Sequence, residues 1–122
     1  MMYQVNVTHC KSGVTRNFNY WLDFQPSEIT KINAFVNGFN ALLEGKAIVT
    51  DIKAIIYQAD KPTLLDVNYT SKVMYEINGG GLTNCSIPYL DRTIKQSEIE
   101  AFMSQHFQNF RKVNNVVHKI MV

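Results

Sequence analysis

Residues 64–77, LLDVNYTSKVMYEI, alternate between two faces over their whole length. A period of two with one apolar face is typical of a strand that is half-buried in an antiparallel sheet. Turn signals stand at both ends, Lys61-Pro62 before the stretch and Asn78-Gly79-Gly80-Gly81 after it. The pattern therefore predicts a strand over 64–77 at the centre of the fold. Its apolar face consists of Leu65, Val67, Tyr69, Ser71, Val73, Tyr75 and Ile77.

This strand is long for a chain of 122 residues. Fully extended, it would span roughly 46 Å at about 3.3 Å per residue. A compact chain of this length has a diameter of only roughly 35 Å. We therefore expect the strand either to bulge, with Thr70-Ser71-Lys72 as its least apolar part, or to project as an arm toward a partner chain. The bulge is the simpler expectation, because bulges commonly bend long strands.

Two segments are predicted to be helices. Residues 27–44 carry an apolar stripe at spacings of three and four, with Pro26 before it and Gly45 after it. A second stripe begins behind the capping-box pattern Ser97-x-x-Glu100 and predicts a helix from about 97 to 115. The members of the second stripe are Ile99, Phe102, Met103, His106, Phe107, Phe110, Val113 and Val117.

The remaining segments are predicted to be strands. Residues 3–7 and 17–24 alternate and are joined by a short connection, which predicts a hairpin. Residues 47–57 are apolar on both faces, a pattern typical of a central strand covered on both sides. Residues 83–90 predict a short strand that Pro88 confines to a sheet edge.

We therefore expect a single α+β domain over residues 1–122, with the element order β-β-α-β-β-β-α. Short turns between successive strands imply one antiparallel sheet of about five strands, with the two amphipathic helices packed on one face. Both helical segments contain a Ser-Glu-Ile sequence and an Ala-Phe pair, but at different spacings. Because the spacings differ, we do not infer an internal repeat.

Composition argues against several classes of protein. The net charge is only +2 and no run of Lys or Arg occurs, so nucleic-acid binding is not expected. No segment reaches the roughly 18 apolar residues of a membrane span, and the first residues lack a signal-peptide pattern. Cys10 and Cys85 are far apart in a chain with a sufficient core, so we expect free thiols and a cytoplasmic location. Charged residues make up 18% of the chain, whereas asparagine occurs twelve times, a composition that suits chains packing beside one another.

The sequence shows no catalytic or metal-binding constellation. His106 lies in an apolar helical stripe, where a packed imidazole is a simpler interpretation than a general base. Cys85 follows the glycine-rich turn, but no nucleophile signature surrounds it. His9, Cys10, Cys85 and His106 lack the close ligand pairs of zinc sites, and the run 78–81 matches no phosphate-binding pattern. We therefore expect neither a metal nor a cofactor.

These observations favour a non-enzymatic interaction or assembly protein. We expect it to associate with itself and to act, in a viral or mobile-element setting, as a structural component or an inhibitor of a host protein. Trp21, the only tryptophan, is the most specific interface candidate, because strand alternation sends it away from the predicted core face into polar surroundings. Its burial by a helix, by a loop or by a shift in register is the other interpretation. The full set of interface candidates is Trp21, Tyr69, Met74 and Tyr75.

A small-molecule-binding or catalytic domain is the alternative. Its pocket would lie between the sheet and the helices, and its candidate residues are His106, Cys85, Tyr69 and Tyr75. Such a protein would gain thermal stability from its ligand, because a ligand that binds only the folded state must stabilise it.

Overall fold

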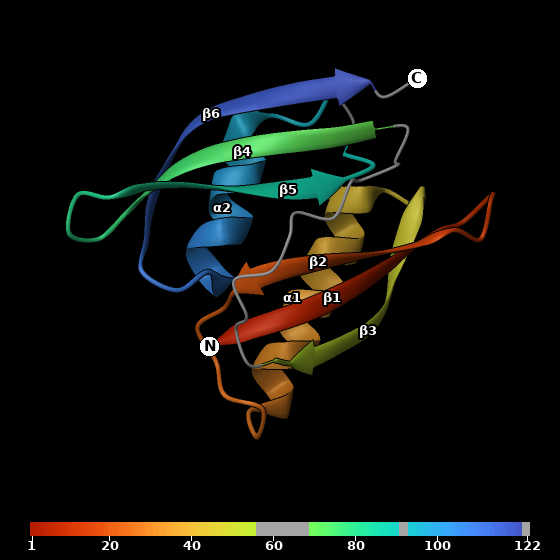
Figure 1. The fold of residues 1–122 in the computed structure, drawn as a ribbon, viewed down its shortest axis with the longest axis horizontal. Coiled ribbons are helices and arrows are strands. Elements are labelled where there is room, and N and C mark those ends of the chain that lie inside the picture. The colour runs from red at the N-terminus through yellow and green to blue at the C-terminus, as the bar shows by residue number, and fades with distance from the viewer. Residues whose placement is uncertain (56–68, 91–92, 121–122) are drawn as a thin grey trace.

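The computed structural model describes residues 1–55, 69–90 and 93–120, which form two antiparallel sheets and two helices (Figure 1). The class is therefore α+β, as predicted, but the strands form two sheets of three instead of one sheet of about five. The elements are β1 (Met2–His9), β2 (Thr15–Trp21), α1 (Ile29–Leu43), β3 (Ala47–Ala54), β4 (Tyr69–Ile77), β5 (Leu82–Pro88), α2 (Gln96–His106) and β6 (Phe110–Ile120).

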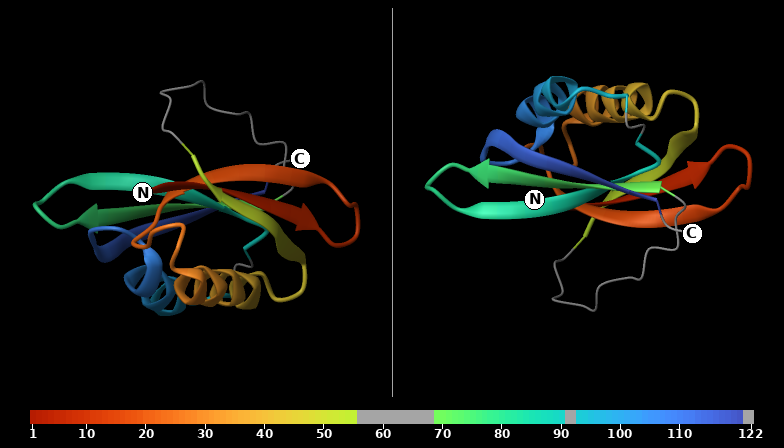
Figure 2. Two further views of the ribbon diagram at one scale, coloured as in Figure 1. Left: turned by 90° about the horizontal axis from the view of Figure 1, so that it is seen from below. Right: turned by 90° about the horizontal axis from the view of Figure 1, so that it is seen from above.

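The chain repeats one topology. The strand orders are β2-β1-β3 and β5-β4-β6, and every pairing is antiparallel. Each half is thus a β-β-α-β unit, in which the first strand is central and the strand after the helix pairs on its free side. Strands β2 and β5 contact each other at the centre of the molecule, and both helices cover the same side of the strand layer (Figure 2). The structure therefore shows a repeat of topology that the unequal sequence spacings did not reveal.

Helix α1 matches its predicted range of 27–44 to within two residues. Glu44 and Gly45 take positive φ values of 49° and 77° and end the helix. Ile29, predicted to start the apolar stripe, is 62% exposed, so the buried face is rotated toward the second row of apolar residues. The buried side chains of α1 are Phe35, Phe39, Leu42 and Leu43.

The predicted range of the second helix was wrong at its C-terminal end. Helix α2 ends at His106, and β6 replaces the last part of the expected helix. The apolar positions between 110 and 117 fit a period of two as well as a helical one. Val113 and Val116 pair with β4 and join the core, and β-branched residues favour this extended backbone. Pairing with β4 therefore stabilises residues 110–117 as a strand instead of a helix.

The predicted capping box was also wrong. The N-cap residue of α2 is Lys95, and its side chain makes no capping hydrogen bond. The carboxylate of Glu100 instead accepts a hydrogen bond from the backbone N–H of Val113 at 2.9 Å. This hydrogen bond joins α2 to β6. It could not be predicted from the sequence, because the pattern predicted a helix where β6 lies.

The strand predictions had mixed outcomes. The hairpin of β1 and β2 is confirmed, and β5 lies at a sheet edge, as Pro88 predicted. Strand β3 was expected to be central, but it lies at an edge, and β1 is the central strand of that sheet. The second apolar face of β3 is not covered by the described residues, since Ile48 is 47% exposed.

Strand β4 is central in its sheet, as predicted, and it begins at Tyr69. Residues 64–68 of the predicted strand lie outside the described residues, so the projecting arm stays untested. Residues 70–72 pair in regular register on both sides, so the bulge expected there is absent. The irregularities occur between Met74 and Tyr75 and between Glu76 and Ile77 in the pairing with β6, where β6 holds the extra residues.

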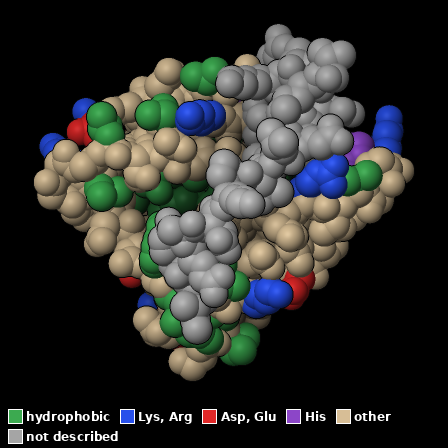
Figure 3. All heavy atoms as spheres, viewed as in Figure 1, with side chains coloured by type: hydrophobic (Ala, Val, Ile, Leu, Met, Phe, Trp, Pro, Cys, Tyr) green, Lys and Arg blue, Asp and Glu red, His purple; other side chains and the backbone are tan. Residues whose placement is uncertain are grey.

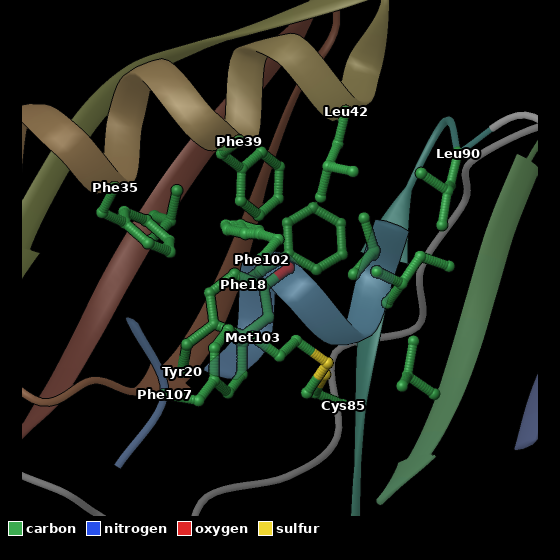
Figure 4. Close-up of a cluster of buried hydrophobic side chains, with 14 of the residues drawn as sticks. Phe18, Tyr20, Phe35, Phe39, Leu42, Cys85, Leu90, Phe102, Met103 and Phe107 are labelled. Atoms are coloured by element: carbon green, nitrogen blue, oxygen red, sulfur yellow. The ribbon is translucent and has the colours of Figure 1, made fainter. Parts of the chain in front are cut away.

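The core lies between the helices and the two sheets (Figure 4). Inward-facing side chains from both sheets and buried residues of both helices belong to one continuous cluster. Phe35 of α1 and Phe102 of α2 lie in contact, with ring centroids 5.5 Å apart. The two units therefore share one core. Within the described residues, no helix combines the length and the apolar character needed to cross a bilayer.

Candidate interaction site

The two units contact each other through equivalent helix residues. Phe35 and Phe102 are each the seventh residue of their helix, and Phe39 and His106 are each the eleventh. Phe39 lies 5.7 Å from Phe102, and His106 lies 5.6 Å from Phe35, measured between ring centroids. These reciprocal contacts place an approximate two-fold axis between the helices.

Backbone hydrogen bonds show the same equivalence. The N–H of Cys10, just after β1, donates to the carbonyl of Lys46 at 2.9 Å. The N–H of Asn78, just after β4, donates to the carbonyl of Asn109 at 2.7 Å. Each unit therefore fastens the end of its central strand to the residue before its last strand.

A β-bulge recurs at the same place in both units. In the first unit the register shifts between Asn6 and Val7, where β3 holds the extra residue Thr50. In the second it shifts between Met74 and Tyr75, where β6 holds an extra residue. The equivalence of the units therefore extends to individual residues and allows their surfaces to be compared.

An open hollow of about 320 Å³ lies beside the end of β2. Figure 3, which looks onto the strands, shows that this face is hollowed between the two sheets and that hydrophobic side chains lie in the hollow. We call this feature the Trp21 hollow. It is lined by Trp21, Tyr75, Ile77, Thr83, Gln108 and Asn109.

Trp21 lies on the outer face of β2, as strand alternation predicts. It is 44% exposed, whereas its neighbour Tyr20 is 2% exposed. The carbonyl of Trp21 accepts a hydrogen bond from the backbone N–H of Gln108 at 3.1 Å, and Leu22 forms an isolated β-bridge with Phe107. The connection between α2 and β6 thus fixes the backbone at the end of β2, where the exposed ring of Trp21 is attached.

Of the other interface candidates whose side chains are described, Tyr75 joins Trp21 in the hollow and Met74 does not. Tyr75 is 5% exposed, and burial raises the pKa of its hydroxyl well above the usual range. Met74 is half-buried on the opposite side of β4. Tyr69 is in β4, but its side chain lies outside the described part of the structure.

Three residues of the hollow were not singled out from the sequence. Gln108 and Asn109 fell inside a helix that was expected to continue to about residue 115, and Thr83 fell at the start of an edge strand. Asn109 has a positive φ of 55°, which asparagine tolerates better than most residues. An asparagine between two apolar periodic segments was thus the available signal for a break at this point.

His106 and Cys85, the central residues of the alternative pocket, are both buried in the core. His106 is 8% exposed and lies between the rings of Phe35 and Phe102, and burial lowers the pKa of its imidazole. Burial raises the pKa of the Cys85 thiol to about 12. The thiol points into the core in Figure 4 and is protonated at neutral pH, so it is a poor nucleophile. Within the described residues, no hydrogen bond joins the two side chains.

The polar pair of Ser71 and His118 was not predicted from the sequence. Ser71 is fully buried, and its hydroxyl lies 2.6 Å from Nδ1 of His118. The two residues are neighbours only because β4 pairs with β6, which the helical prediction excluded. The pair satisfies the buried hydroxyl of Ser71, while His118 is only half-buried. Among the described residues, no three His, Cys, Asp or Glu side chains are grouped as metal ligands would be.

A second, polar hollow of about 340 Å³ borders the first and shares Gln108 and Asn109 with it. Glu28 and Lys31 line it and form an ion pair of 2.8 Å. The hydrogen bond from Lys31 lowers the pKa of Glu28. The ion pair is exposed to solvent, so it contributes little to stability.

Comparison of the chain with protein-family models, with curated proteins and with solved structures gave no match. A functional conclusion must therefore come from the site itself, because a fold alone does not imply a function.

Proposed function

We propose that this chain is a non-enzymatic interaction or assembly domain that associates with a second copy of itself through the outer strand face around Trp21. The observation that carries the proposal is the exposed ring of Trp21 beside an apolar hollow. Tryptophan is enriched among interface hot spots, because it desolvates a large area at little entropic cost.

The outer strand face supports the proposal beyond Trp21. Strand pairing places Ile48, Leu82 and Val117 on the same face, and they are 47%, 65% and 40% exposed. The described helices cover only the opposite face (Figure 2). Exposed apolar side chains gathered on one face are typical of interaction surfaces.

Asparagine is frequent on this face. Pairing places the side chains of Asn6, Asn17, Asn19, Asn84 and Asn115 there. Amide side chains make a surface polar without mutual repulsion, which suits contact between identical surfaces. Such contact is isologous, since each copy presents the same patch to the other. A cytoplasmic location and a role in a virus or mobile element belong to the same proposal and are supported by composition alone.

The ligand pocket around His106 and Cys85 has less support. The cysteine is buried and protonated, and the imidazole packs between aromatic rings, so neither group is placed for chemistry. No observation favours this second candidate over an interaction surface.

Light scattering and fluorescence test the proposal together. We expect a mass above 14.0 kDa at high protein concentration and a blue shift of Trp21 emission on association. Replacement of Trp21 by serine should abolish the association. The matched control is Ile29→Ser, which removes an exposed apolar side chain from the helical side and should leave association unchanged. A wild-type monomer at every concentration would refute self-association.

A further inference from the structure

The wall of the Trp21 hollow has an equivalent in the first unit. The backbone N–H of Ile77 donates to the carbonyl of Gly81, and that of His9 donates to the carbonyl of Val14, both at 2.9 Å. The last residue of β4, Ile77, therefore corresponds to the last residue of β1, His9. Two residues earlier, Tyr75 pairs with Thr83 in the second hairpin. The corresponding pair in the first hairpin is Val7 with Arg16.

An aromatic ring occupies the equivalent place in the first unit. Tyr89 stacks on His9, with ring centroids 4.7 Å apart and the planes inclined by 29°. Burial raises the pKa of Tyr89, and the nearby charge of Arg16 opposes this rise. The ring therefore lies against His9, the residue that corresponds to Ile77, and it is only 8% exposed.

At the hollow beside the second hairpin, which the rings of Trp21 and Tyr75 line, the residue equivalent to Tyr89 supplies no ring. Tyr89 directly follows β5, and the residue that directly follows β2 is Leu22. Leu22 is fully buried, bridges to Phe107 and does not line the Trp21 hollow. Helix α2 is also shorter than α1, with 11 residues against 15, so the irregular connection through Gln108 and Asn109 borders the hollow.

We infer that the Trp21 hollow receives an aromatic side chain, tyrosine or phenylalanine, of a partner protein, as the equivalent place in the first unit receives Tyr89. This inference rests on the proposed function and names the chemistry that the interaction surface takes up. The aromatic rings of Trp21 and Tyr75 and the side chain of Ile77 offer apolar contacts to such a ring.

The rest of the lining fits the same occupant. Thr83, Gln108 and Asn109 place hydrogen-bonding groups at the hollow, where the hydroxyl of a tyrosine would need a partner. The volume lies at the lower end of the range of about 300–1,000 Å³ for ligand pockets, which suits a side chain better than a large cofactor. Among the described residues no Lys or Arg lines the hollow, which disfavours a nucleotide, whose phosphate would need a cation.

The test uses p-cresol, a small molecule that corresponds to the side chain of tyrosine, as the probe. Trp21 supplies the only indole N–H resonance of the 15N-labelled protein. We expect p-cresol to shift this resonance saturably and to bind about two- to tenfold more tightly than 4-methylcyclohexanol, which has the same size but no aromatic face. Absence of a saturable shift, or equal binding of both probes, would overturn the inference.

Two substitutions on β5 locate the binding. Thr83→Tyr places a ring in the hollow from within the chain and should abolish the response to p-cresol. Asn84→Tyr adds the same ring on the opposite face of the strand, at an exposed position, and should preserve the response. Both positions lie in an edge strand, where tyrosine is well tolerated. An undiminished response in the first variant would place the binding elsewhere and overturn the inference.

Tyr89→Leu supplies the converse test. It gives the position after β5 the residue type found at the equivalent position after β2, Leu22. This should create a second binding place for p-cresol, beside the first hairpin, so that the stoichiometry rises from one to two. A thermal melt checks that the variant is folded, and the two β5 variants decide the question if it is not. A folded variant that still binds one p-cresol would contradict the equivalence on which the inference rests.

The outcomes separate this inference from the proposed self-association. A monomeric protein that binds p-cresol and loses the response in Thr83→Tyr supports the hollow and refutes self-association. A self-associating protein that does not respond to p-cresol supports the proposed function and overturns the hollow. Displacement of p-cresol by a single-stranded oligonucleotide would overturn the assignment to a protein side chain.

Discussion

The two β-β-α-β units share topology, register and a β-bulge, yet they cover their sheets differently. The first unit has a helix of 15 residues, and Tyr89 closes the end of its hairpin. The second has a helix of 11 residues and an open hollow at the corresponding place. Two units with the same backbone topology can therefore have different surfaces. The difference depends on the length of the helix and on the side chain that follows β2 or β5. Tyr89 covers the first hairpin, whereas Leu22 leaves the hollow beside the second hairpin open.

The units also differ at the helix contact. Phe39 and His106 occupy equivalent positions and make equivalent ring contacts across the axis. An imidazole in place of a phenyl ring brings a titratable group into an apolar contact, where burial lowers its pKa. We therefore expect the helix contact of the second unit to depend on pH.

The largest effect is expected at the contact between the units. Phe35→Ala should lower the free energy of unfolding by about 3–5 kcal/mol, because it leaves a cavity at the axis among rings from both halves. Urea denaturation measures the loss. The control Ile29→Ala removes an exposed side chain of the same helix and should cost less than about 0.5 kcal/mol. Equal losses in the two variants would show that the units do not depend on this contact.

Phe39→His gives both units a histidine at the helix contact. We expect a loss of about 2 kcal/mol in the free energy of unfolding at pH 7, since a polar ring replaces a buried apolar one. The loss should increase as the pH falls, because the unfolded state then binds a proton that the buried imidazole resists. Urea denaturation at pH 7 and pH 5 measures both effects, and a loss that does not change with pH would argue against the equivalence of positions 39 and 106.

The two hairpin turns provide a matched pair of backbone tests. Gly13 and Gly80 have φ values of 72° and 90°, and each donates its N–H to the last residue of the preceding strand. Alanine at either position should cost about 1–2 kcal/mol, because an added Cβ meets no neighbour and only the left-handed backbone is strained. Thermal or urea denaturation compares the variants. A cost at one turn only would show that the hairpins differ in rigidity.

His106→Phe makes the helix contact symmetric and should have the smallest effect, a stabilisation of about 1 kcal/mol at pH 7. The pKa of His106 is lowered in the folded state, so wild-type stability should fall as the pH drops below the usual histidine pKa of about 6.5. The variant should lose this part of the pH dependence. Stability curves of both proteins between pH 7 and pH 5 isolate the effect, because His9 and His118 are common to both. Parallel curves would contradict the assigned role of burial.

Local patterns in the sequence determined a large part of the molecule. The range of α1, the hairpin of β1 and β2 and the outward direction of Trp21 follow from the spacing of apolar residues along one segment. Spacing predicts these features because it decides which side chains share a face, whatever that face later contacts.

Tertiary structure decided the rest. Val113 and Val116 fit a helix and a strand equally well, until pairing with β4 supplied partners for the extended backbone. The division into two sheets and the Trp21 hollow depend on segments far apart in the chain, such as the ends of β2 and α2. Periodicity carries no information about which distant segment will cover a face, because long-range packing and strand pairing determine that choice.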